Sequence, residues 1–269
     1  MSDSVPSAVT DDRLSAGDVE LHVAGPRADV VLVRPQARNA QTPATWRALA
    51  AVPELLGDDV RVVVLSARGT SFSAGLDRRM IDGSGVPGEP ALTDMARMSA
   101  ADLTATIGQF QRAFTWWREV EAVTVAAVQG HAVGAGFQLA LATDLLLCAD
   151  DAQLAMRETS LGLVPDLGGT APLVATVGYS RALEICATGR WVHAEEAARL
   201  GLAQAVVPLD ALAAATDDLV AALLAAPGGA LSATKHLLAG AGERTRAEQL
   251  EAERTAQVGR LAELARLIG

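Results

Sequence analysis

The stretch VQGHAVGAGFQLALATDLLL, residues 128–147, holds three glycines and two alanines between Gly130 and Gly136 and is mostly apolar afterwards. A buried strand is expected to end at this turn and a helix to begin at Gly134. The first amide N–H groups of a helix have no partner within it, and they lie at the positive end of its dipole. Small side chains let a ligand oxygen come close to such a backbone. The pattern predicts a turn that binds an anion or a polarised oxygen, with tight helix packing as the alternative.

The rest of the chain alternates strand-like and helix-like patterns. Runs of β-branched residues predict buried strands, and the Thr-Pro pair at residues 42–43 predicts the start of a helix. The expected strands cover residues 28–35, 61–67, 123–130 and 145–150, and the expected helices cover residues 42–56 and 134–143. Buried strands that alternate with helices are typical of an α/β protein.

The composition changes along the chain and predicts three parts. The first residues are polar and acidic, and we expect a frayed tail over residues 1–17. The α/β core is expected over residues 18–208. From Thr188 the chain becomes rich in alanine and leucine, and residues 209–269 should be helical without clear strands.

Charge and cysteine content exclude several classes of protein. The 269 residues carry 22 basic and 32 acidic side chains, a net charge of −10, which argues against binding to nucleic acid. No apolar run reaches the ~18 residues of a membrane span, and the acidic N-terminus does not resemble a signal peptide. Cys148 and Cys186 have no CxxC spacing and lie among apolar residues. We therefore expect reduced cysteines and a cytoplasmic protein that does not associate with membranes.

A second glycine turn, GTSFSAGLD at residues 69–77, follows the second strand. It presents amides around Gly75 and Leu76, and two such turns can converge on one oxygen as an oxyanion hole. Farther along, Glu158 and Asp166 interrupt an apolar segment, where a carboxylate can act as a general acid or base. Each acid also has a plainer interpretation as a solvated group, and Asp166 could cap the helix that follows it.

Taken together, these motifs resemble the crotonase superfamily, the enoyl-CoA hydratase/isomerase family. The motifs are RPQARNA (34–40), SFSAGLD (71–77), VQGHAVGAGFQLALATDLLLCADDAQLAM (128–156), LGLVPDLGGTAPL (161–173) and ATGRWVHAEEAARLGLAQAVVP (187–208). The resemblance implies a crotonase-like spiral of ββα turns with an acyl-CoA site, followed by a helical trimerisation region. It implies a homotrimer or a hexamer built as a dimer of trimers, acting in fatty-acid type metabolism. Coenzyme A would be part of the substrate, and no separate cofactor is expected.

The resemblance also assigns roles to residues. The two backbone donors of the oxyanion hole fall on Leu76 and Ala135. The residues expected to bind the substrate or its coenzyme A portion are Arg34, Arg38, Ser73, Ala74, Gly75, Asp77, Gly134 and Lys235. The three cations in this set are candidates for contact with the coenzyme phosphates, and a solvated side chain is the alternative for each.

Two glutamates hold the water in hydratases of the family, and they match positions 138 and 158. Glu158 is present, but Gln138 occupies the first place and cannot exchange a proton near neutral pH. This difference favours a single-base double-bond isomerase over a hydratase, and it leaves a non-catalytic acyl-CoA-binding protein as an alternative. Asp166 matches an aspartate of dienoyl-CoA isomerases. It also matches the nucleophile of the dehalogenase branch, which has no acid at position 158.

Two further kinds of site fit the sequence less well. A strand, a glycine turn and a helix also occur in dinucleotide-binding domains, but Gly130, Gly134 and Gly136 are spaced GxxxGxG where that fingerprint requires GxGxxG. The four histidines show no ligand spacing, so no metal is expected.

Overall fold

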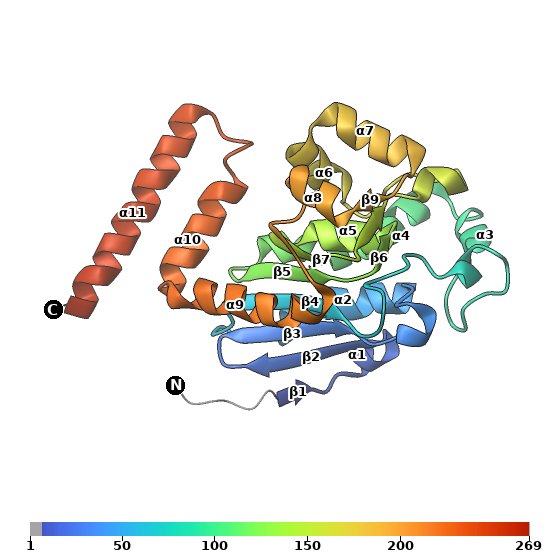
Figure 1. Cartoon of the computed structure of the whole chain (residues 1–269), viewed down its shortest axis with the longest axis horizontal. Coiled ribbons are helices and arrows are strands. Elements are labelled where there is room, and N and C mark those ends of the chain that lie inside the picture. The colour runs from blue at the N-terminus through green and yellow to red at the C-terminus, as the bar shows by residue number, and fades with distance from the viewer. Residues whose placement is uncertain (1–6, 269) are drawn as a thin grey trace.

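The computed structural model describes residues 7–268 and contains a seven-stranded main sheet (Figure 1). Its strands, in spatial order, are β1 (Ser7–Val9), β2 (Val19–Ala24), β3 (Arg27–Leu32), β4 (Val62–Ala67), β5 (Val123–Val128), β7 (Leu145–Ala149) and β10 (Ala205–Val207). The β1-β2 and β2-β3 pairs are antiparallel, and each later pair is parallel. The spatial order follows the chain order without reversing, so the sheet lacks the switch point at which a dinucleotide-binding fold holds its ligand. The dinucleotide-binding interpretation is therefore wrong.

The helices and a second sheet surround the main one. The second sheet consists of β6 (His131–Val133), β8 (Gln153–Ala155) and β9 (Val192–His193). The helices are α1 (Asp12–Ala16), α2 (Pro43–Leu55), α3 (Leu92–Met95), α4 (Ala100–Glu119), α5 (Ala135–Ala142), α6 (Thr170–Val177), α7 (Tyr179–Thr188), α8 (Ala194–Arg199), α9 (Leu212–Ala225), α10 (Gly228–Ala239) and α11 (Arg246–Ile268).

Strand β4 shows why the central strands are apolar at successive positions. Val63 and Leu65 point into the larger core, which includes residues of α2, α4 and α5. Val62 and Val64 point into a smaller core on the opposite face, where α9 packs. Because both faces of the strand are buried, the period-2 alternation of a half-exposed strand disappears. The strand predicted at residues 61–67 is thus confirmed.

The predicted helices at residues 42–56 and 134–143 are confirmed as α2 and α5. Thr42 caps α2, since its hydroxyl accepts from the amide of Thr45 and the Thr45 side chain reaches back to the amide of Thr42. Pro43 occupies the first helical position, where its missing N–H costs no hydrogen bond. All eight residues of α5 are buried, which explains why this helix lacks a polar face.

The prediction of a frayed tail over residues 1–17 is wrong for the part of this segment that the structure describes. Ser7–Val9 form the edge strand β1, paired with β2. Asp11 caps α1, and the side chain of Leu14 is buried in the main core. A single apolar residue and a three-residue strand carry too little periodicity to be recognised, because their stabilisation comes from partners elsewhere in the chain. Residues 1–6 lie outside the described part.

The helical C-terminal region begins after β10, but its helices differ in how they pack against the main sheet. Helix α9 lies along the main sheet, and Leu212 and Val220 are buried against it. Helices α10 and α11 pack as a pair, in which α10 contacts β5 of the main sheet and α11 extends away from it (Figure 1). The short strands β9 and β10 lie in the alanine-rich stretch before this region, so strands continue beyond Thr188 as far as Val207.

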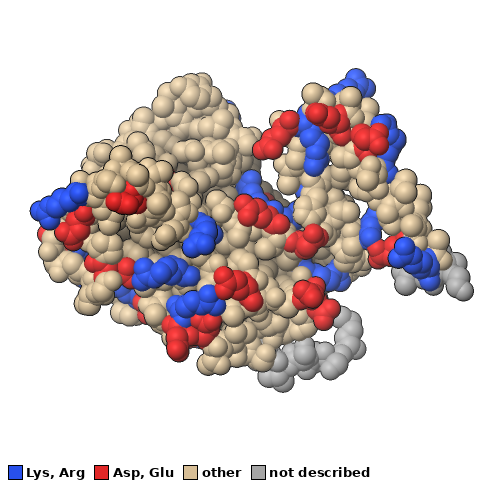
Figure 2. Space-filling view, turned by 180° about the vertical axis from the view of Figure 1, so that it is seen from behind, with Lys and Arg blue, Asp and Glu red and all other residues tan. Residues whose placement is uncertain are grey.

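The surface carries both acidic and basic side chains, as the composition of the sequence implies. Acidic and basic side chains are interspersed on the face shown in Figure 2. Within residues 7–268, no helix combines the length and apolarity needed to cross a membrane.

Candidate active site

The two glycine turns predicted from the sequence meet backbone to backbone at the start of α5. A methyl group added to Gly75 would lie 2.2 Å from the carbonyl oxygen of Val133 and 3.5 Å from the amide nitrogen of Ala135. One added to Gly136 would lie 2.5 Å from the carbonyl oxygen of Ser73. Close packing therefore accounts for Gly75 and Gly136. Gly134 differs, since its neighbour is a carboxylate: an added methyl group would lie 3.3 Å from Oε1 of Glu158.

Two backbone amides are left available at this junction. Ala135 is the first residue of α5, and Leu76 lies between two groups that pair with Gln41, because Gly75 O accepts from Gln41 N and Asp77 N donates to Gln41 O. The hydrogen bonds of residues 7–268 include none from the amide N–H of Leu76 or of Ala135. Both N–H groups are therefore available to an acceptor that the described chain does not supply.

Gln138 and Glu158 form a hydrogen-bonded pair beside these amides. Gln138 lies on α5, and Glu158 begins the short 3-10 helix at residues 158–161. The Gln138 oxygen accepts from the backbone amides of Leu167, at 3.0 Å, and Gly169, at 3.3 Å. Since two donors fix this oxygen, the amide cannot flip, and its Nε2 donates to Glu158 Oε1 at 2.7 Å. Gln138 therefore orients Glu158.

The second oxygen of Glu158, Oε2, is buried and has no hydrogen-bond partner within residues 7–268. Burial raises the pKa of Glu158 above its ordinary value, the negative charge of Asp166 adds to this rise, and the hydrogen bond from Gln138 opposes it. A raised pKa and an unpaired oxygen are properties of a carboxylate that can accept and return a proton.

Asp166 lies near Glu158 but does not join this hydrogen-bonded pair. Its backbone carbonyl accepts from Gln111 Nε2 at 2.7 Å, and burial raises the pKa of its carboxyl group. The interpretation of Asp166 as a helix cap is wrong, because α6 begins at Thr170 and its N-cap residue is Gly169.

The loop at residues 71–77 is fastened to the RPQARNA turn by side chains. The Ser73 hydroxyl donates to Asn39 O and accepts from Gln41 Nε2, so it joins the loop to this turn. Ala74 N donates to Arg38 O. Arg38 is exposed and adopts a left-handed backbone conformation, with φ of 51°. The sequence reasoning missed Asn39 and Gln41, although the polar residues that follow RPQAR were the available signal.

Two cations expected near the coenzyme are already paired. Arg34 binds the carboxylate of Asp77 at 2.7 Å. Arg79, which the sequence reasoning did not single out, also binds Asp77, at 2.9 Å. Lys235 is buried, and its ammonium group bonds to Asp144 at 2.8 Å and to two backbone carbonyls. The structure thus brings Arg34 and Asp77 beside Leu76, whereas it commits Lys235 to holding α10 against the core.

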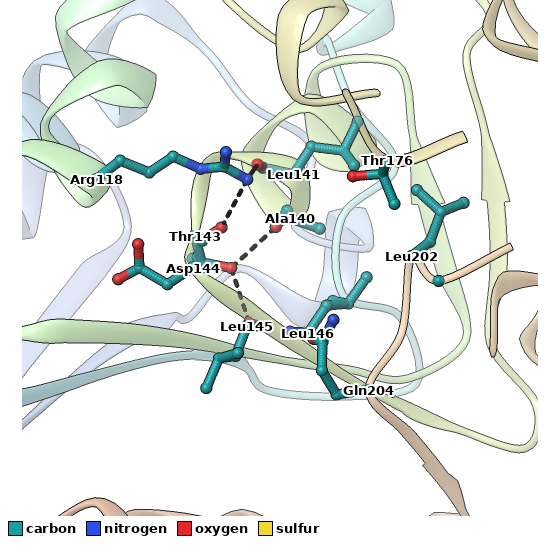
Figure 3. Close-up of a pocket in the computed structure, with 11 residues that line it drawn as sticks. Arg118, Ala140, Leu141, Thr143, Asp144, Leu145, Leu146, Thr176, Leu202 and Gln204 are labelled. Atoms are coloured by element: carbon teal, nitrogen blue, oxygen red, sulfur yellow. Dashed lines mark hydrogen bonds between the residues drawn. The ribbon is translucent and has the colours of Figure 1, made fainter. Parts of the chain in front are cut away.

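A small cavity of about 50 Å³ lies at the other end of α5 (Figure 3), and Glu158 is not among the residues that line it. Arg118 donates there to the carbonyls of Leu141 and Thr143, which are the orphan acceptors at the end of the helix. A cation at this position also stabilises the negative end of the helix dipole. Arg118 therefore fixes one end of α5 while Ala135 presents an amide at the other.

Known proteins share this arrangement over nearly the whole chain. The family model described as Enoyl-CoA hydratase/isomerase matches residues 28–264. The crystal structure of a Thermobifida fusca YX protein in complex with CoA is 47% identical and superposes with a TM-score of 0.90, covering 97% of this chain and 99% of that one. A Thermobifida fusca YX structure in complex with acetoacetyl-CoA gives the same identity and TM-score, covering 96% of this chain and 100% of that one.

Curated relatives agree with the structural comparison. The Mycobacterium tuberculosis protein named "Probable enoyl-CoA hydratase echA8" is 33% identical over 188 residues, which are 68% of this chain and 66% of that protein, just under two thirds of its length. A carnitinyl-CoA dehydratase of Citrobacter koseri is 33% identical over 79% of this chain and 77% of its own length. The matching family model and the shared fold show that this chain belongs to the enoyl-CoA hydratase/isomerase family, within the crotonase superfamily.

Proposed function

We propose that the protein moves a double bond within an enoyl-CoA thioester, with Glu158 as the only proton carrier. The observation that carries this proposal is the fixed pair of Gln138 and Glu158, in which one carboxylate oxygen is held and the other is unpaired. The solved relatives that bind CoA and acetoacetyl-CoA support an acyl-CoA substrate. We place the thioester carbonyl against the amides of Leu76 and Ala135.

The proposed reaction is balanced without water or a cofactor. Glu158 removes a proton from C2 of a 3-enoyl-CoA, and the electron pair passes into a dienolate whose charge collects on the thioester oxygen. The amides of Leu76 and Ala135 stabilise that charge, and a single donor of this kind contributes about 3 kcal/mol. The protonated Glu158 then returns the proton at C4, which gives the 2-enoyl-CoA.

Hydration requires more than this site supplies. A water must lose a proton as it attacks C3, and C2 must gain one, so hydratases of this family use two carboxylates. Gln138 can hold a water through its amide, but it cannot exchange a proton. The fixed orientation of its amide favours a role in holding Glu158.

Gln138→Glu is expected to introduce hydration of crotonyl-CoA. The backbone amides of Leu167 and Gly169 can hold a glutamate oxygen as they hold the glutamine oxygen. The second oxygen of this glutamate would then lie where Gln138 Nε2 now donates to Glu158. Two adjacent carboxylates raise one another's pKa, so the pair would share a proton. The isomerisation rate depends on ionised Glu158, and its fall on the acidic side should therefore begin at a higher pH than in the wild type. Crotonyl-CoA hydration and the pH dependence of kcat/KM measure the two effects.

Gln138→Met is the matched control for this experiment. It keeps the volume of the side chain but has neither donor nor charge, so isomerisation should fall and no hydration should appear. Two outcomes count against the proposal. Hydration by the wild type at a rate similar to isomerisation would make Gln138 compatible with a hydratase. Binding of enoyl-CoA by the wild type and by Gln138→Glu, with turnover by neither, would establish the non-catalytic carrier instead.

We also propose that the protein assembles as a trimer or as a dimer of trimers through its C-terminal helices. The apolar side chains of Leu250, Val258, Leu261 and Leu264 on α11 are exposed in the single chain, as is Leu238 on α10. Exposed leucine and valine residues on a projecting helix pair are typical of a surface that another subunit covers. Analytical ultracentrifugation should give the mass of three or six chains. Leu261→Glu should lower that mass, and a wild-type monomer would refute the proposal.

A further inference from the structure

We infer that Arg34 is a positioning residue, which acts through Asp77 to hold the Leu76 amide in place and does not bind a coenzyme phosphate. The inference rests on the proposed function, because it concerns one of the two amides assigned there to the thioester oxygen. It replaces the role in coenzyme binding that the sequence suggested for Arg34.

The direction of the Leu76 N–H is set by its neighbours in the chain. The carbonyl of Gly75 accepts from Gln41 N at 2.7 Å, and it belongs to the same planar trans peptide as the Leu76 N–H. The two groups therefore point in opposite directions, and the N–H faces away from Gln41. On the other side, Asp77 N donates to Gln41 O at 2.8 Å. A rotation of the Gly75–Leu76 peptide would turn the Leu76 amide away from the site, and the bond from Asp77 N restrains the peptide that follows it.

The carboxylate of Asp77 anchors this segment through its contacts with two arginines. It is almost completely buried and accepts from Arg79 at its backbone amide and at two guanidinium nitrogens, and from Nη1 of Arg34. The hydrogen bonds from Arg79 and from Arg34 hold the pKa of Asp77 well below its usual range. A carboxylate that stays ionised while buried depends on its partners, because removing one leaves charge without compensation.

Arg34 is poorly suited to a phosphate. Its guanidinium is half-buried, donates to Ala40 O at 3.1 Å and lies between two carboxylates, with Asp77 at 2.7 Å and Asp18 at 3.7 Å. Two negative groups at one guanidinium repel a third. The bond to Ala40 also ties Arg34 to the turn that carries Gln41, so one side chain connects both segments that define the Leu76 peptide.

The test compares two ligands that share all coenzyme phosphates. CoA itself has no thioester carbonyl, whereas the enolate of acetoacetyl-CoA needs the oxyanion donors. In Arg34→Met, we expect the affinity for acetoacetyl-CoA to fall roughly tenfold or more, together with its enolate absorbance and with kcat. The affinity for CoA should not change. Arg68→Met is the matched control, since within residues 7–268 the side chain of Arg68 pairs only with the surface carboxylate of Glu20.

A double-mutant cycle covers the case in which Arg34→Met perturbs folding. If Arg34 acts through Asp77, then adding Arg34→Met to Asp77→Asn should have little further effect on acetoacetyl-CoA binding. Equal losses for CoA and acetoacetyl-CoA in Arg34→Met, or full additivity in the cycle, would overturn the inference and return Arg34 to the phosphates. The proposed function fails separately, if the wild type binds acetoacetyl-CoA no better than CoA and shows no enolate absorbance.

Discussion

Glu158→Gln should lower turnover of a 3-enoyl-CoA by about 10²- to 10⁴-fold, the usual contribution of a general acid or base. Glutamine keeps the shape of the side chain and can still accept the hydrogen bond from Gln138 Nε2, but it cannot take up the proton of the substrate. The affinity for acyl-CoA should change little, because the proposed contacts to the thioester oxygen come from backbone amides. Steady-state kinetics and titration with a non-reacting acyl-CoA measure the two quantities.

The pH dependence provides an independent check of the same assignment. Burial raises the pKa of Glu158, and only its ionised form can act as the base. Wild-type turnover should therefore fall as the pH is lowered through this raised pKa, and the residual activity of Glu158→Gln should lack that fall. Glu195→Gln, at an exposed position on α8, should behave as the wild type. If Glu158→Gln retains activity and Asp166→Asn abolishes it, then Asp166 carries the proton.

Gly75→Ala should lower turnover by about 10²- to 10³-fold, as expected for the loss of one oxyanion donor. The new methyl group would lie 2.2 Å from the carbonyl oxygen of Val133, and because this oxygen belongs to the backbone, no side-chain movement can relieve the contact. The loop at residues 71–77 must therefore shift away from the start of α5. This shift would separate the Leu76 amide from the Ala135 amide, so kcat should fall more than the affinity for CoA.

Strain in the backbone must be distinguished from displacement of the loop. Gly75 has φ of +80°, a conformation that alanine adopts at a cost of about 1 kcal/mol or more. Gly178, between α6 and α7, has φ of +79°, and a methyl group there would meet nothing within 4 Å. Gly178→Ala should therefore lower the thermal midpoint without a comparable loss of turnover. Similar kinetic losses in both variants would mean that the effect of Gly75→Ala is general destabilisation.

The parts of this protein that the sequence predicted are those with a local signal. Helix α5 and the turn before it follow from small residues at Gly134, Ala135 and Gly136 and from the apolar run after them. Helix α2 follows from a capping residue and a proline at its start. In each case the residues that determine the structure are adjacent in the chain, so patterns of period and capping are sufficient.

The remaining features depend on partners that are distant in the chain. Arg34 pairs with Asp77, which is 43 positions away, and no local pattern distinguishes this cation from one that binds a phosphate. The orientation of Gln138 comes from backbone amides of residues 167 and 169, and backbone donors leave no signature in the identity of a residue. Edge strand β1 likewise depends on its pairing with β2. Tertiary contacts therefore determine the features that no local sequence pattern predicts.

The hydrogen bonds from residues 167 and 169 to Gln138 also have an evolutionary consequence. Main-chain donors bind any side-chain oxygen of suitable reach, so they can hold a glutamine or a glutamate. In the genetic code, the codons for these two amino acids differ by a single nucleotide. A lineage with this scaffold can thus exchange one-carboxylate chemistry for two-carboxylate chemistry in one mutational step, without rebuilding the surrounding backbone. The same scaffold allows the reverse step, so the reaction type within such a lineage need not follow its branching order.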